Sequence, residues 1–222
     1  MFEQALELDP QYAEAYAFLG RTYTWEWGLQ WSQDAQALDQ ALALAQKAVA
    51  VDDSLAQAHA TLGNVYAWKK QYSQAIAEAK RAIALDSNFA EAYMSLAETL
   101  RFAGRPEEAL GLIEKAMRLN PHYPAIYLFS LGTAYRLMGR NEEAIAAFKS
   151  ALTRNPDLLP VHVNLAVIYS ELGREEEARA EAAEILRLNP KYSLEVLRQI
   201  NPFKDPAVNE RMIAALRKAG LK

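Results

Sequence analysis

The chain has 222 residues, of which 51% are hydrophobic, and only 9 are Gly and 9 are Pro. This composition supplies enough apolar side chains for a folded core and too few turn-forming residues for an all-β protein, so we expect a largely helical protein. The 24 Lys and Arg and 28 Asp and Glu are interspersed, which argues against nucleic acid as a partner, and the lack of cysteine excludes disulfides and thiolate ligands.

The N-terminal segment, MFEQALELDP (1–10), carries acidic residues where a signal peptide would carry basic ones. No apolar run along the chain approaches the roughly 20 residues that are needed to cross a bilayer. We therefore expect a soluble, cytoplasmic chain that has no membrane partner.

A leucine followed by a small residue recurs along the chain with a period of about 34 residues. The leucines are Leu19, Leu62, Leu96, Leu131 and Leu165, and only the first interval is clearly longer than this period. Small residues recur in the same register at Ala41, Ala75, Ala109, Ala144 and Ala178, and again at Ala48, Ala82, Ala116 and Ala151. Such self-similarity predicts stacked helical units of one kind.

The turn inside each unit is marked by a second motif: AGRPEEA at 103–109, MGRNEEA at 138–144 and LGREEEA at 172–178. The glycines, Gly104, Gly139 and Gly173, are suited to the left-handed conformation that ends a first helix. The acidic residues that follow suit the positive end of a second helix. Each unit is therefore predicted to be a helix–turn–helix hairpin.

These motifs resemble the tetratricopeptide repeat, a helix–turn–helix unit of about 34 residues. The resemblance implies an all-α, right-handed superhelical α-solenoid that forms a single domain over 1–222. The five expected repeats are 13–55, 56–89, 90–124, 125–158 and 159–192. Residues 1–12 match the end of a second helix that lacks its first helix, so we expect them to come from a longer chain. A C-terminal cap is expected over 193–222, with Asp205 as the N-cap of its helix.

The first repeat is longer than the others, and the surplus lies between Tyr23 and Ala41. We expect the first helix to end at Gly28 and the second to start with Ser32 as its N-cap, several turns longer than its counterparts. Three of the four tryptophans fall here: Trp25, Trp27 and Trp31. They either pack the tip of this long hairpin or form a contact patch for a partner domain or a second copy, giving a homodimer.

In the family that the chain resembles, the first helix of each repeat lines a concave groove that takes a protein or peptide partner. Mapping the family's exposed positions onto this sequence gives a candidate protein-binding groove: Phe18, Arg21, Trp25, Asn64, Trp68, Met94, Glu98, Arg101, Phe102, Phe129, Arg136, Leu137 and Asn164. Aromatic, Met and Arg side chains are typical of protein interfaces. For Trp68 and Phe102 the alternative is packing beside the next first helix.

No catalytic, cofactor-binding or metal-binding constellation is predicted. His59 and His162 take the fourth position of their repeats, where a core aromatic is usual, and we expect packed histidines without a base partner at useful spacing. The pair Glu107 and Glu108 begins a helix, where the helix dipole accounts for it. We therefore expect a non-enzyme that needs no cofactor, acting as a protein interaction scaffold or, alternatively, as a self-association module.

A narrower resemblance involves INPFKDPAVNERMIAALRKAGL (200–221), GRPEEALGLIEKAMRLNPHYP (104–124) and the long first hairpin. These segments are similar to the C-terminal repeat region of bacterial class III adenylate or guanylate cyclase-like proteins. The resemblance implies a regulatory or docking region of a multidomain signalling protein. The metal-binding Asp pair of the cyclases has no match here, so the resemblance implies no cyclase activity.

Overall fold

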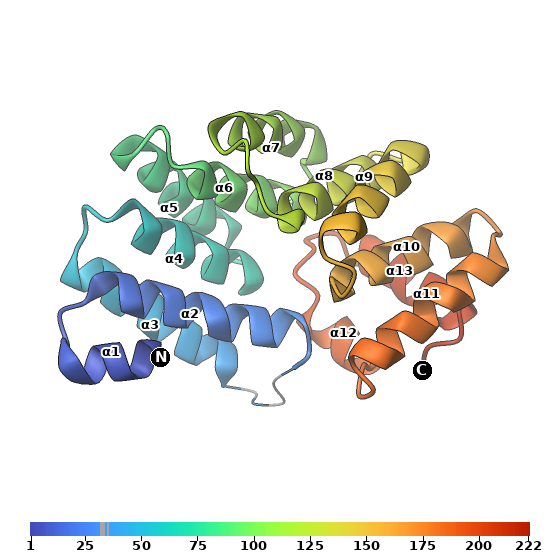
Figure 1. Cartoon of the computed structure of the whole chain (residues 1–222), viewed down its shortest axis with the longest axis horizontal. Helices are drawn as coiled ribbons and strands as arrows, with labels where there is room; N and C mark the ends of the chain where they lie inside the picture. The colour runs from blue at the N-terminus through green and yellow to red at the C-terminus, as the bar shows by residue number, and fades with distance from the viewer. Residues whose placement is uncertain (32–33, 35) are drawn as a thin grey trace. The chain divides into compact units, whose positions relative to one another are not determined.

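The structure is a computed structural model that describes residues 1–31, 34 and 36–222. These residues form thirteen helices and no strand (Figure 1), which confirms the all-helical prediction. They fall into two compact units, Met1–Pro121 and His122–Lys222. That the chain forms a single solenoid domain stays a prediction.

Unit 1 consists of a short helix followed by three helix hairpins. Its helices are α1 Phe2–Leu8, α2 Ala13–Gly28, α3 Ala37–Val51, α4 Ala56–Trp68, α5 Tyr72–Leu85, α6 Ala90–Phe102 and α7 Pro106–Leu119. The first helices α2, α4 and α6 contact one another in a row, and α3 and α5 each pack on their own first helix and on the next one. The first helices approach each other more closely than the second helices do, so their layer lies on the inner side of the curvature within unit 1.

Unit 2 consists of two hairpins and a C-terminal pair of helices. Its helices are α8 Ala125–Leu137, α9 Asn141–Arg154, α10 Leu159–Glu171, α11 Glu175–Leu188, α12 Leu194–Ile200 and α13 Pro206–Lys218. The Asp205 side chain accepts a hydrogen bond from the Ala207 backbone N–H at 2.9 Å, as expected of the N-cap of α13. The Ser170 hydroxyl donates to the Ala215 carbonyl oxygen at 2.8 Å, which fastens α13 to α10.

The small residues of the repeat let the two helices of a hairpin approach closely. A Cβ atom added to Gly63 would lie 3.1 Å from the carbonyl oxygen of Ala75, and one added to Gly132 would lie 2.6 Å from the ring of Phe148. The first contact is tighter than ordinary van der Waals distance and the second is a clash. Close packing of the two helices therefore explains why a small residue follows the recurring leucine.

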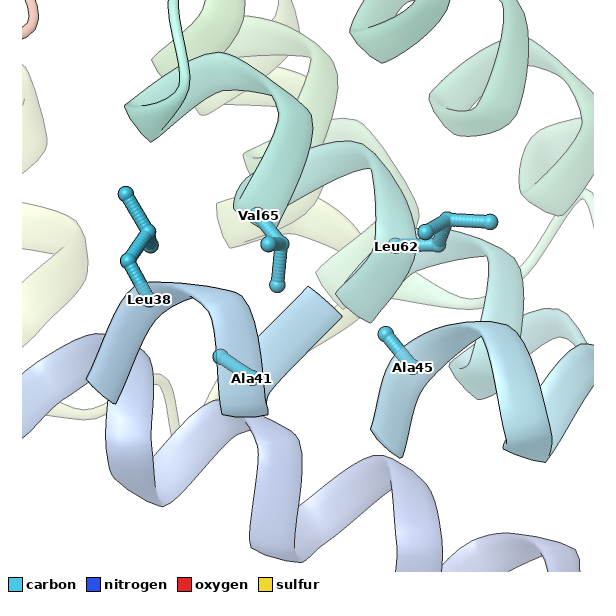
Figure 2. Packing of buried hydrophobic residues seen from close by; sticks show 5 residues of the cluster. All are labelled: Leu38, Ala41, Ala45, Leu62 and Val65. Atoms are coloured by element: carbon cyan, nitrogen blue, oxygen red, sulfur yellow. The ribbon is translucent and has the colours of Figure 1, made fainter. Parts of the chain in front are cut away.

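The core between neighbouring hairpins is built from aliphatic side chains of small and medium size. Figure 2 shows one cluster, in which Leu38, Ala41 and Ala45 of α3 face Leu62 and Val65 of α4. All five side chains are buried. Interlocking of small and larger side chains along this seam holds one hairpin against the next.

The hairpin turns follow the predicted glycine motif. Gly104, Gly139 and Gly173 have positive φ angles of 79°, 75° and 74°. Lys70 takes the same place in the second hairpin with a φ of 60°. In these turns the backbone leaves the first helix through the left-handed region, where a side chain is disfavoured.

The first hairpin differs from the prediction. Its second helix, α3, begins at Ala37 and has 15 residues against 14 in α5, so the expected extension by several turns is wrong. The predicted N-cap, Ser32, lies outside the described residues. The Asp34 carboxylate accepts a hydrogen bond from the Gln36 backbone N–H at 2.8 Å, and this local turn lies immediately before the helix. The insertion instead lengthens α2, which ends at Gly28 as predicted and has 16 residues against 13 in α4, together with the connection that follows.

Candidate functional site

Four residues of the predicted groove come together in unit 1, where α4 and α6 lie side by side. The indole Nε1 of Trp68 donates a hydrogen bond to Glu98 Oε1 at 3.1 Å. The Trp68 and Phe102 rings meet edge to face with centroids 5.5 Å apart, and the Arg101 guanidinium lies 5.6 Å from the Phe102 centroid. We call these four residues the α4–α6 cluster.

The two charged members of the α4–α6 cluster influence each other's ionisation. Arg101 is only 3% exposed, and Glu98 is half-buried. Burial raises the pKa of the Glu98 carboxyl, although the Arg101 charge and the hydrogen bond from Trp68 oppose this effect. Burial also lowers the pKa of the Arg101 guanidinium, and the Glu98 charge opposes it. Each charge is therefore stabilised by the other in a site with little water.

The remaining groove candidates of α2, α4 and α6 differ in how far their side chains are buried. A Cβ atom at Gly28 would lie 2.7 Å from the Trp68 ring, so the indole reaches the end of α2. Asn64 is half-buried, and its Oδ1 is enclosed without a hydrogen bond from the described residues. Met94 is buried, and Trp25 is 41% exposed. Of these candidates, Trp25 presents the most open surface.

Phe18 and Arg21 form a separate group at the N-terminal edge of unit 1. The Phe18 ring stacks on Phe2 of α1 with centroids 5.5 Å apart and an interplanar angle of 13°. The Arg21 guanidinium lies 4.7 Å from the Phe18 centroid. The α1 helix therefore covers part of the surface that the sequence assigns to a partner.

Unit 2 holds the other predicted groove residues. Arg136 Nε of α8 donates to Asn164 Oδ1 of α10 at 2.7 Å, and Asn164 is buried. Phe129 lies beside Phe148 of α9, with centroids 6.3 Å apart, and Leu137 is half-buried. The structure thus joins α8 to α10 through a polar pair that the sequence had placed on a binding surface.

The three tryptophans of the first hairpin have different environments. Trp27 packs against the cluster of Figure 2, and its Nε1 is enclosed without a hydrogen-bond partner among the described residues. Trp25 is 41% exposed and Trp31 is 60% exposed. Packing explains Trp27, whereas a contact role for Trp25 and Trp31 stays a prediction.

Sequence reasoning missed the partners of two histidines. His59 Nδ1 lies 2.6 Å from Glu78 Oε2, and His162 Nδ1 lies 2.6 Å from Glu181 Oε2. The expectation that neither histidine has a base partner at useful spacing is therefore wrong. Both glutamates follow their histidine by 19 residues, and this shared spacing was the signal in the sequence. Across the described part of the chain, no group of three His, Asp or Glu side chains is arranged to hold a metal ion.

Successive helix hairpins that stack through their first helices, with small residues setting the helix spacing, define an α-solenoid repeat protein. Family models described as tetratricopeptide repeat match residues 56–89, 88–157 and 135–198. Together they span more than half of the sequence, so the chain belongs to the tetratricopeptide repeat family. Repeats of this family generally mediate protein–protein interaction and are generally not enzymes.

Solved structures of other repeat proteins share the fold. TTC0263, a thermophilic TPR protein of Thermus thermophilus, is 27% identical over 86% of this chain and 95% of its own, with a TM-score of 0.64. PilW, a type IV pilus biogenesis factor, is 19% identical over 93% of this chain and 90% of its own, with a TM-score of 0.65. YrrB, a TPR protein with an unusual peptide-binding site, is 23% identical over 86% and 94% of the two chains, with a TM-score of 0.50. The likeness to PilW and YrrB extends to the fold alone.

The search of curated proteins found no match to this sequence. Among the described helices, none combines the length and the apolar character that a membrane crossing requires.

Proposed function

We propose that unit 1 binds a protein or peptide partner on the face formed by α4 and α6, and that it acts as a scaffold without catalytic activity. The observation that supports this function is the α4–α6 cluster on the inner layer of unit 1. Trp68 and Glu98 are the partly exposed members of this cluster, and Arg101 and Phe102 are buried beneath them. Trp side chains are prominent in the energy of protein interfaces, because they combine a large apolar surface with a directed polar group.

The α4–α6 cluster is already ordered in the free chain. The hydrogen bond from Trp68 to Glu98 fixes the indole, and the Phe102 ring supports it from the side. A side chain that is held in its binding position loses little conformational entropy when a partner arrives. The partly exposed Glu98 carboxylate also penalises a partner that cannot hydrogen-bond to it, which favours specific over general apolar contact.

The proposal also includes the kind of protein in which these repeats act. The similarity of 200–221 and 104–124 to the tails of cyclase-like proteins suggests a docking region within a multidomain signalling protein. In that setting the partner is another domain or a regulatory protein, and the repeats supply the surface that selects it.

The test compares two tryptophans of unit 1 by the same substitution. Peptides or proteins selected by immobilised wild-type chain are titrated against wild type, Trp68→Ala and Trp31→Ala by calorimetry. We expect Trp68→Ala to weaken binding by about 30-fold, the effect of an interface hot spot, and Trp31→Ala to leave it unchanged. Circular dichroism melts verify that both variants fold.

Equal affinity of folded Trp68→Ala and wild type would contradict the assignment to the α4–α6 face. Loss of binding in Trp31→Ala alone would move the site to the end of the first hairpin.

The alternative function is self-association through Trp25 and Trp31, whose exposed indoles favour it. Light scattering over a concentration series would then show a dimer of wild type and a monomer of the Trp25→Ala, Trp31→Ala double variant. A wild-type monomer at every concentration would exclude this alternative.

A further inference from the structure

His162 makes two hydrogen bonds from the interior of the fifth repeat. Its Nδ1 lies 2.6 Å from Glu181 Oε2 on α11, and its Nε2 lies 2.8 Å from the carbonyl oxygen of Pro156. Pro156 belongs to the turn that precedes α10. The imidazole therefore bridges three segments: its own helix, the second helix of the hairpin and the turn between the fourth and fifth repeats.

Both partners of the ring can only accept hydrogen bonds. A backbone carbonyl oxygen has no proton to donate, and neither has an ionised carboxylate. A neutral imidazole carries one N–H group, so it can satisfy only one of these acceptors. Both contacts are made together only when the ring is doubly protonated.

The surroundings of His162 favour the positive charge. The ring is 6% exposed, and this burial lowers its pKa. The hydrogen bonds to Glu181 and Pro156, together with the negative charges of Glu181 and Glu184, outweigh the burial, so the pKa of His162 is raised above its ordinary value.

One cation lies close to these carboxylates. Arg187 of α11 pairs with Glu184 at 2.7 Å and with Asp157 of the same turn at 2.5 Å. Glu181 makes no ion pair with a described residue other than His162. The carboxylate that touches the ring is therefore not neutralised by Arg187.

We propose that His162 is a proton-dependent latch of the fifth repeat. As an imidazolium it ties α10 to α11 and to the preceding turn, and loss of one proton releases one of these two ties. One hydrogen bond fewer then fastens the hairpin at that point, so its resistance to opening falls as the solution becomes more alkaline.

The second repeat contains the same arrangement in different charge surroundings. His59 Nδ1 lies 2.6 Å from Glu78, and its Nε2 lies 2.9 Å from the carbonyl oxygen of Asp53. At the sequence position where the fifth repeat has Glu184, the second repeat has Arg81. The second carboxylate is therefore the feature that distinguishes the fifth repeat, and the latch is assigned to His162.

The direct test is a nitrogen NMR titration of the imidazole rings in the whole chain. At about pH 7 we expect both ring nitrogens of His162 to carry protons, with a titration midpoint above the ordinary value of about 6.5. In Glu181→Gln the side chain still accepts a hydrogen bond but lacks the charge, so the midpoint should fall. A single protonated nitrogen in the folded wild type at about pH 7, or an unchanged midpoint in Glu181→Gln, would overturn the proposal.

A second measurement uses stability and has an internal control. His162 has a raised folded pKa, so its contribution is complete below about pH 6.5 and is lost as the pH rises through the folded pKa. The melting temperature of wild type should therefore drop between about pH 6 and about pH 9 by more than that of His162→Gln. His122→Gln, which changes an exposed histidine, should behave as wild type. The same pH dependence in His162→Gln and wild type would exclude the latch.

Discussion

Gly132 shows why the residue after the recurring leucine is small. Its position on α8 faces the Phe148 ring of α9, which is fully buried. The ring has little freedom to move aside, because it also contacts Phe129. A single methyl group at this position therefore forces two helices apart.

We predict that Gly132→Ala lowers the free energy of unfolding by about 1–3 kcal/mol through overpacking. Gly111→Ala is the matched control. Gly111 is an exposed glycine of α7 with nothing within 4 Å of an added Cβ, so the same substitution should raise stability by about 0.5–1 kcal/mol through helix propensity. Urea denaturation of the two variants measures both signs. A stabilised Gly132→Ala would show that α8 and α9 can separate freely.

Individual side-chain contacts were the least predictable level of the structure. The position of His162 in its repeat was evident from the sequence, but its bond to Glu181 depends on how α11 turns its side chains toward α10. The periodic pattern reports which residues face inward and does not report which polar atoms meet. Two histidines that are each followed by a glutamate at the same spacing would have indicated the pairing, since that separation carries the chain across one hairpin.

Among the elements, the regular hairpins were predictable and the first was not. The turns at Gly104, Gly139 and Gly173 carry a local motif, and the structure places a hairpin turn at each of them. The sequence showed correctly that the first hairpin contains extra residues. Nothing in the periodicity showed how these residues divide between α2 and the connection. The turn in which Asp34 accepts a hydrogen bond from the Gln36 N–H lies directly before α3, and the periodicity did not predict it.

The candidate binding face could be predicted only in part from the positions of its residues within the repeat. The repeat assigns Trp68, Glu98, Arg101 and Phe102 to first helices, so their shared layer was predictable. Their mutual contacts were not, because the small side chains of α4 and α6 set how closely these helices approach. Arg101 was predicted to line the surface and is instead buried behind it.

For the whole molecule, a repeat array distributes stability among neighbours. Within each of the two compact units, a hairpin contacts mainly the hairpins adjacent to it in sequence. A defect in one hairpin should therefore be felt most strongly nearby.

We predict that Leu62→Ala, which removes a buried side chain from the cluster of Figure 2, lowers the free energy of unfolding by about 2–5 kcal/mol. Hydrogen exchange measured by mass spectrometry should accelerate most in α3 and α4, and less in α10 and α11 of unit 2. Leu8→Ala, at a side chain that is almost fully exposed, is the control and should change neither quantity. A uniform acceleration along the chain would mean that the array unfolds as one cooperative body.

The extra length of α2 carries its last turn beyond the end of α4. With 16 residues against 13 in α4, and about 1.5 Å of rise per residue, α2 extends about 4.5 Å further at its C-terminal end. Gly28 lies in this added turn, and a Cβ atom there would meet the Trp68 ring at 2.7 Å. The insertion of the first repeat therefore supplies a backbone surface against which the indole of the second repeat packs, so a side chain at position 28 would displace Trp68.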